Sequence, residues 1–365
     1  MKNTKKEIKK YYDVKKDFEA YPDAWCYVVW SKRGAGKTYS MLKYGREIEN
    51  TFLYMKRTNE DIDFLCSGAK IKDIAKKDPS PYYPLNRDLK WNVKPVLISK
   101  GFAGFWDHNE NSEPIGEPLS MAISLNNAKQ IKGFDFSYSK FLVLDEFIPQ
   151  IGEIVRRREG EMLLDLYMTV LRDREARGEE SLKLVLFANA EEISTPITNT
   201  LEIVDDMAEL DASGARYKYL EDRGIMLHHI TQEECPQIEA EKGGIYKGMR
   251  GTAWFEKTFE GRFASNDFSN VKTKQRLTGY SCYIAVRHQR HWYYIYQNKN
   301  TGMWYACDTP NKPIVSYDLS RENEQKRFYE NERPYLIDLC INEYLKFSKY
   351  SFYDLLINFK DFYKV

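Results

Sequence analysis

Residues 31–38 read SKRGAGKT, which matches the phosphate-binding loop G-x-x-x-x-G-K-[ST] except that Ser31 replaces the first glycine. Gly34 and Gly36 would let the backbone curl so that its N–H groups face phosphate oxygens. Lys37 would reach the β- and γ-phosphates, and the hydroxyl of Thr38 would bind Mg²⁺. A helix that begins here would direct the positive end of its dipole at the anion. The candidate nucleotide contacts are Ser31, Lys32, Arg33, Gly34, Ala35, Gly36, Lys37 and Thr38.

This loop predicts binding of ATP with Mg²⁺. The alternative is a glycine-rich turn that carries a surface lysine. A strand-like run before the loop and a helix-like run after it favour the phosphate-binding interpretation.

A pair of acids ends the apolar run FLVLDEFI at residues 141–148, which is a Walker B pattern. Asp145 would hold the hydration shell of Mg²⁺, and Glu146 would orient and deprotonate the attacking water. Adjacent acids at the carboxyl end of a strand point into the crevice where ligands bind in open α/β sheets. The alternative is two acids that open a surface loop, which the presence of the phosphate-binding loop makes less favourable.

Two further segments carry polar groups suited to the same chemistry. Asn189 ends the apolar run LFANA at 186–190 and is a candidate sensor of the γ-phosphate or the attacking water, although asparagine is also a common turn residue. TVLRDREAR at 169–177 places Arg172, Arg174 and Arg177 near a helix end. An arginine delivered to a neighbour's γ-phosphate stabilises charge in the transition state. The alternative is an exposed helix end with Arg–Asp pairs.

These residues need a scaffold of strands and helices. Apolar runs predict strands at 24–30, 52–57, 95–99, 119–125, 141–146 and 182–190, and helical spacing predicts helices at 39–50 and 161–174. Continuous apolar strands that alternate with helices indicate a parallel α/β sheet. The long gap between Lys37 and Asp145 leaves room for an extra strand between the two motif strands. This arrangement resembles the additional-strand, catalytic-glutamate class of P-loop NTPases.

The composition predicts a division into three parts. Residues 1–200 would form the P-loop ATPase domain, with a basic N-terminal arm or short helix in the first 24 residues. Residues 201–244 are rich in acids and would form a linker or small lid. Residues 245–365 would form a smaller α+β domain, with tyrosine-rich antiparallel strands at 280–286, 291–297 and 302–308 and helices from about residue 321.

The formal net charge is only +1, so affinity for nucleic acid must come from local patches. Residues 271–300 contain no acid and are a candidate site for sequence-independent contacts with a phosphate backbone. The alternative is a solvated β-hairpin with tyrosines in the core. The candidate contacts are Lys272, Lys274, Arg276, Arg287 and Arg290.

Other classes of protein are disfavoured. The six cysteines are scattered without a CxxC pair, which argues against zinc sites and a disulfide framework and suits a reducing cytosol. No apolar stretch approaches the roughly 18 residues that span a bilayer, and no secretory signal is visible at the start. A protein outside membranes is therefore expected.

The order of SKRGAGKT, FLYMKR, LVLDEFI, TVLRDRE and LFANA resembles the DNA-packaging (encapsidation) ATPases of small podophages, the phi29-like group of the Picovirinae. The resemblance covers about residues 10–195. It implies a ring motor, a pentamer docked on the portal of a procapsid in the host cytoplasm, which hydrolyses ATP to drive double-stranded DNA inside. By the same resemblance, Arg172 matches a trans-acting arginine finger, and Lys132 in QIKGF falls where the family has a second trans-acting basic residue.

The family's C-terminal domain resembles a vestigial nuclease of RNase H type. A two-metal nuclease needs several carboxylates at strand ends, yet the tyrosine-rich strands carry none before Asp308, and Asp318 lies further along. We therefore expect no nuclease activity. Some relatives dock on a structural RNA at the portal, and the basic residues between 271 and 300 could serve that contact as well.

Two alternative functions remain open. One is another P-loop ATPase that acts on nucleic acid, such as a helicase-like or partition-type protein, although no helicase motif series accompanies the two Walker elements. The other is a nucleotide-binding assembly scaffold with little turnover, for which a base such as Glu146 would have no use. A small-molecule phosphotransferase is poorly served by a basic, aromatic second domain.

Overall fold

The computed structural model describes residues 10–49, 51–67, 79–128, 136, 138–150, 152–172, 174–236, 243–264, 266–272 and 274–364. The chain divides into two compact units. The larger comprises Met1–Ile154, Glu159–Ile193 and Glu209–Ser265, and the smaller comprises Val155–Arg158, Ser194–Ala208 and Asn266–Val365.

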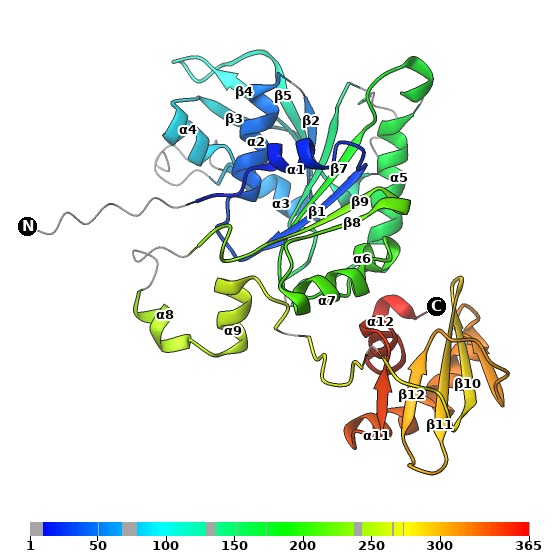
Figure 1. Cartoon of the computed structure of the whole chain (residues 1–365). Coiled ribbons are helices and arrows are strands. Elements are labelled where there is room, and N and C mark those ends of the chain that lie inside the picture. Colours follow the sequence, from blue (N-terminus) through cyan, green and yellow to red (C-terminus); the bar gives the residue numbers. More distant parts are fainter. Residues whose placement is uncertain are drawn as a thin grey trace, which may run out of the picture. The chain divides into compact units, whose positions relative to one another are not determined.

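The described part of the larger unit is built on a nine-stranded sheet in the order β3-β4-β5-β2-β6-β7-β1-β9-β8 (Figure 1). From β5 to β9 every neighbouring pair is parallel, whereas β3, β4 and β8 add antiparallel edges. The predicted parallel α/β sheet is thus confirmed. The strands are β1 (Cys26–Ser31), β2 (Phe52–Lys56), β3 (Val93–Ser99), β4 (Phe102–His108), β5 (Pro114–Ser124), β6 (Phe141–Asp145), β7 (Lys183–Asn189), β8 (Tyr217–Leu220) and β9 (Ile225–Ile230).

The order of the central strands positions the two motifs. β7 lies between β1, which precedes the phosphate-binding loop, and β6, which ends in Asp145. In register, Ser31 lies beside Asn189, and Asp145 lies beside Phe187. The predicted extra strand between the motif strands is therefore present. As a result, the carboxyl ends of β6, β7 and β1 meet at one edge of the sheet.

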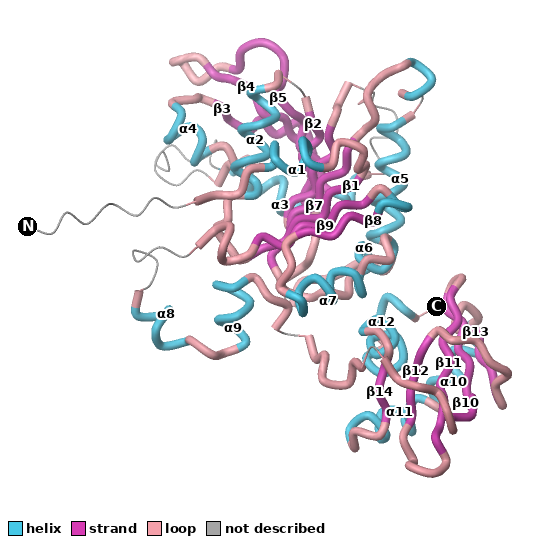
Figure 2. The backbone as a smooth tube through the Cα atoms, viewed as in Figure 1, coloured by secondary structure: helices cyan, strands magenta, loops and turns pink. Residues whose placement is uncertain are grey.

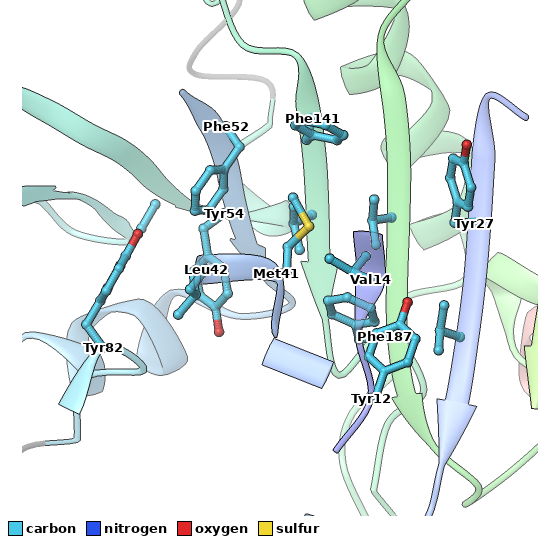
Figure 3. Packing of buried hydrophobic residues seen from close by; sticks show 14 of the residues in the cluster. Tyr12, Val14, Tyr27, Met41, Leu42, Phe52, Tyr54, Tyr82, Phe141 and Phe187 are labelled. Atoms are coloured by element: carbon cyan, nitrogen blue, oxygen red, sulfur yellow. The ribbon is translucent and has the colours of Figure 1, made fainter. Parts of the chain in front are cut away.

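Helices cover the sheet. Its central strands carry apolar side chains on both faces, because both faces of a parallel sheet are buried. The helices assigned to the larger unit are α1 (Val14–Ala20), α2 (Lys37–Glu47), α3 (Asn59–Leu65), α4 (Tyr83–Leu89), α5 (Glu159–Leu171), α8 (Gly244–Met249) and α9 (Ala253–Phe255). α7 (Val204–Ser213) crosses from one unit to the other. Figure 3 shows Tyr12, Val14 and Met41 packed over Phe187 of β7, and all four belong to one buried cluster.

Residues 104–118, which lie between the strands predicted at 95–99 and 119–125, contain most of β4 and the start of β5. The turn residues around the hairpin hide this from the sequence, because Gly104 and Gly116 read as loop signals. Gly104 is needed inside β4, since an added Cβ would lie 2.5 Å from the ring of Trp106.

The boundaries of the units also differ from the expected ones. Within the range 201–244, expected to be a linker or lid, β8 and β9 complete the main sheet, and every residue of β9 is buried. The acids that suggested a linker lie on α7 and before β9, whereas IMLHHI, with four apolar residues and two buried histidines, is a core strand. Residues 245–264, assigned to the C-terminal domain by composition, belong to the larger unit.

The smaller unit is α+β, as predicted. Its described strands form a five-stranded sheet in the order β13-β10-β11-β12-β14 (Figure 2). β10, β11 and β12 are antiparallel, and β13 and β14 add parallel edges. The strands are β10 (Tyr280–His288), β11 (His291–Asn298), β12 (Trp304–Cys307), β13 (Val315–Asp318) and β14 (Leu345–Phe347), with helices α6 (Pro196–Thr200), α10 (Glu322–Asn331), α11 (Arg333–Ile341) and α12 (Tyr350–Tyr353).

Candidate functional site

The phosphate-binding loop joins β1 to α2 in the geometry that anion binding needs. Gly34 and Gly36 have φ angles of 76° and 88°, in the left-handed region that glycine adopts without strain. α2 begins at Lys37, so its first N–H groups lie at the end of the loop. An added Cβ at Gly36 would also lie 3.1 Å from the ring of Tyr11, which is a second reason for glycine there.

Lys37 is buried at the base of this loop. Its ammonium donates to Ser31 Oγ at 2.6 Å and to Asn189 Oδ1 at 3.3 Å. Ser31, the departure from the motif, therefore contacts the lysine of that motif. Burial lowers the pKa of Lys37 to about 8, against the opposing charges of Asp145 and Glu146. A phosphate group that replaced these two oxygen acceptors would restore full charge to the amine.

The two predicted metal ligands lie together. Thr38 Oγ1 donates to Asp145 Oδ2 at 3.0 Å, and the hydroxyl of Tyr54 donates to the same oxygen at 2.8 Å. Burial favours the protonated form of Asp145, but Lys56 and these hydroxyl groups hold its pKa below the usual value. One carboxylate and one hydroxyl fit Mg²⁺, which is typically bound by one or two carboxylates, phosphates and waters.

Glu146 follows β6 with a φ angle of 59° and exposes about half of its side chain. Its Oε2 lies 2.8 Å from Nζ of Lys56, the last residue of β2, and the same ammonium lies 3.3 Å from Asp145 Oδ2. Burial alone would lower the pKa of Lys56, yet Asp145, Tyr54 and Glu146 together raise it well above its usual value. Lys56 is therefore a stable cation between the two acids.

A cavity of about 350 Å³ lies over the loop and is lined by residues of the predicted segments 31–38, 141–148 and 186–190, whereas no described residue of 169–177 lines it. The strand β7 contributes Ala188 and Asn189, and α2 contributes Tyr39. The complete lining is Arg33, Gly34, Ala35, Gly36, Lys37, Thr38, Tyr39, Asp145, Glu146, Ala188 and Asn189. The structure thus brings together residues predicted from three separate stretches of sequence, 31–38, 141–148 and 186–190.

The N-terminal segment supports the outer side of the loop. The backbone N–H of Tyr12 donates to the carbonyl of Ala35 at 3.0 Å, and that of Val14 donates to Ser40 Oγ at 2.9 Å. The Tyr12 hydroxyl donates to Asp17, which also contacts the buried ring of His228 at 2.8 Å. Although burial favours a neutral ring, the hydrogen bonds to Asp17 and Glu234 raise the pKa of His228.

A segment after α9 supports the loop from another direction. An added Cβ at Gly261 would lie 2.4 Å from the backbone nitrogen of Lys32, so the two backbones are in close contact. Nearby, the carboxylate of Glu191 forms ion pairs with Arg33 at 3.2 Å and with Lys257 at 2.6 Å. Sequence reasoning missed Glu191 and Gly261 because their partners are distant in the chain.

Arg172 directly follows α5, is exposed and has a φ angle of 39°. Its Nε donates to the carbonyl of Thr169 at 3.0 Å, and it is not among the described residues that line the cavity. Arg174 is buried and lies 3.5 Å from Glu179, which also pairs with Arg177. Lys132 lies outside the described residues.

The basic residues of the smaller unit fall into two groups. Lys272, Lys274 and Arg276 are exposed on the segment before β10. Arg287 lies 3.7 Å from Asp318, and Arg290 pairs with Glu202, so their charges are partly neutralised. Asp308 pairs with Lys349. In the described part of the chain, no group of three or more His, Cys, Asp or Glu residues could hold a metal ion.

Comparison with solved structures gives matches over almost the whole chain. A chain of the bacteriophage phi29 viral genome packaging motor assembly is 18% identical with a TM-score of 0.56, and the match covers 94% of this chain and 97% of that one. The chain shares the fold of that motor protein. The phi28 gp11 DNA packaging motor is 16% identical with a TM-score of 0.53, and the match covers 92% of this chain and 93% of that one. No protein-family model and no curated protein matches this chain.

Among the described residues, no helix combines the length and the apolar character that crossing a membrane would require.

Proposed function

We propose that this chain is an ATPase that drives double-stranded DNA into a viral procapsid. The observation that carries the proposal is the meeting of Lys37, Thr38, Asp145 and Glu146 at one cavity of about 350 Å³. The fold shared with two phage packaging motors supports the choice of DNA packaging among the activities that P-loop ATPases perform.

In this proposal each residue of the site has a separate role. The loop N–H groups and Lys37 bind the phosphates of ATP, and Thr38 and Asp145 hold Mg²⁺. The metal, when bound, offsets negative charge on the phosphate oxygens. Glu146 accepts a proton from the attacking water, and Asn189 positions the water or the γ-phosphate. Lys56 keeps Asp145 ionised, so that this carboxylate is available as a ligand at neutral pH.

Arg172 acts in this proposal on the site of an adjacent subunit. It is exposed and does not line its own cavity, which supports a role in trans. The working form would be a homo-oligomeric ring, a pentamer, bound to the portal of the procapsid in the host cytoplasm. Double-stranded DNA would contact the exposed cations Lys272, Lys274 and Arg276, and a structural packaging RNA at the portal is a further partner in this proposal.

The decisive experiment measures ATP turnover by the full chain alone, with double-stranded DNA, with portal-bearing procapsids, and with both. We expect the highest turnover with both together. Glu146→Gln should lower this turnover by about a hundredfold or more while ATP binding persists. Glu47→Gln, an exposed acid at the end of α2, is the matched control and should leave turnover unchanged.

Two results would contradict the proposal. Undiminished turnover in Glu146→Gln would mean that Glu146 is not the base. Stimulation by single-stranded DNA alone, without procapsids, would favour a helicase-like ATPase.

A further inference from the structure

The two faces of the smaller sheet are covered differently. One face packs against α10, α11 and α12 through a cluster that includes Ile295, Phe328, Leu336 and Phe352. The cluster on the other face contains Cys282, Tyr296, Tyr305 and Cys307, and in the described residues it is joined by Leu277, Tyr280 and Tyr294 rather than by a helix. Among the described residues, the segment that leads into β10 (the covering segment) contributes Leu277 to this cluster, and no helix residue belongs to it.

Aromatic side chains continue along this face beyond the covering segment. Trp292, Tyr294 and Tyr296 alternate along β11 and so share one side of the strand. The rings of Trp292 and Tyr294 are nearly parallel, with centroids 6.4 Å apart and planes at 25°. Trp292 is 40% exposed although it is a large apolar side chain in a strand of the sheet. Tyr296, by contrast, is buried, so the open part of the row is the Trp292–Tyr294 pair.

Cations are found beside this aromatic pair and on the covering segment of the same face. Arg287 is exposed and lies directly opposite Trp292 in the register of β10 and β11. The covering segment carries the exposed residues Lys272, Lys274 and Arg276, and it is fixed to the face where the Tyr305 hydroxyl donates to the carbonyl of Lys272 at 2.8 Å. Two acids also lie close: Asp318 is 3.7 Å from Arg287, and Glu202 pairs with Arg290 and His291. The cations of the covering segment are not among the described ion pairs.

We propose that the Trp292–Tyr294 pair is a platform on which the bases of single-stranded nucleic acid stack, with the phosphates held by the covering segment. An aromatic ring on a sheet can stack only on a base that has left its own helix, so this chemistry selects unpaired nucleotides over duplex. Stacking tolerates any base, and the cations supply sequence-independent affinity. This surface shares the cations of the covering segment with the duplex contacts of the proposed motor and adds the aromatic pair, and its operation does not require ATP turnover.

Fluorescence anisotropy of the full chain tests the proposal, with labelled oligo-U, oligo-dT and a blunt DNA duplex of the same length as probes. The double variant Trp292→Ala/Tyr294→Ala should weaken binding of the single strands by about tenfold or more and leave duplex binding within about threefold. Trp292→Phe should retain most of the affinity because its ring still stacks. The two single strands distinguish an RNA site from a DNA site.

Trp254→Ala is the matched control, because Trp254 is also 40% exposed but lies in α9 of the larger unit. Its affinity for single strands should equal that of the unmodified protein. Equal affinity of the double variant and the unmodified protein for both single strands would overturn the proposal. The exposed aromatic pair would then be a candidate contact for a protein partner instead. Equal losses on single strands and duplex would also overturn it. Basal ATP turnover, measured in parallel, should not change in the double variant, so failure here is distinguishable from failure of the proposed motor.

Discussion

The ammonium of Lys56 lies 2.8 Å from a carboxylate oxygen of Glu146, so the proposed catalytic base is tied to the end of the neighbouring strand β2. The same ammonium lies 3.3 Å from Asp145. Lys56 therefore serves two acids at once, one proposed as a metal ligand and one as a base. To take a proton from water, Glu146 must exchange this contact for one with the water.

Lys56→Met should move the acidic limb of the pH–rate profile for ATP hydrolysis to higher pH. Burial raises the pKa of Asp145, and the charge of Lys56 normally outweighs this effect. Without that charge, the pKa of Asp145 should rise. The carboxylate would then become protonated, and lose its metal, at a higher pH than in the unmodified protein. Lys56→Arg keeps the charge and should keep the profile. Identical acidic limbs in the Met and Arg variants would contradict this role of Lys56.

ATP binding should weaken as the pH rises above about 8, the pKa to which burial lowers Lys37. Below this pH the amine is charged before ATP arrives; above it, binding must first take up a proton. The dissociation constant should rise by up to about tenfold for each further pH unit, which isothermal titration calorimetry can follow. Calorimetry in buffers of different ionisation enthalpy should detect the proton uptake. An affinity that is constant between pH 7.5 and about 9.5 would contradict the low pKa.

Arg172→Ala should lower the stimulated ATP turnover by about a thousandfold if Arg172 acts at the site of a neighbouring subunit. Mixed with Glu146→Gln subunits it should regain part of the activity, since each variant supplies what the other lacks. Arg177→Ala is the matched control, because Arg177 lies nearby and pairs with Glu179. The absence of any recovery across mixing ratios would count against a shared site.

Arg57→Met should destabilise the larger unit by about 3–5 kcal/mol, because it removes the cation that pairs with the buried carboxylate of Glu159. Arg57 is almost fully buried and forms two hydrogen bonds to Glu159, at 2.9 and 3.2 Å, and one to the carbonyl of Ile154. Urea denaturation followed by circular dichroism measures the loss. Arg87→Ala, which removes an exposed pair with Asp88, should not change the midpoint. Equal midpoints for both variants would show that the buried pair contributes nothing.

The motifs could be predicted from the sequence because each is a run of adjacent residues whose chemistry and local structure agree. SKRGAGKT specifies its own loop, and FLVLDE specifies a buried strand with acids at its end. Their meeting followed from a general property of parallel sheets, in which the carboxyl ends of strands share one edge. Asn189 was found by the same argument.

Lys56 and Tyr54 could not be predicted, because their role depends on β2 being the neighbour of β6, and local patterns do not specify strand order. The alternation in FLYMKR indicates a strand but not its partner. β9 was missed for a different reason: the surrounding acids dominated the composition of its stretch, and the two histidines of IMLHHI interrupt its apolar residues. A high density of charged residues indicates exposed positions in a segment. It does not exclude a short buried strand between them.

The contact between Tyr12 and Ala35 makes the nucleotide loop dependent on a part of the chain that lies more than twenty residues upstream. If residues 10–20 were deleted, the carbonyl of Ala35 and the hydroxyl of Ser40 would lose their hydrogen bonds to the backbone of this segment. The buried ring of His228 would lose its contact with Asp17. The empty loop would then sample more shapes, and ATP would have to order it upon arrival. A truncated protein would thus bind ATP more weakly although every residue around the cavity is intact.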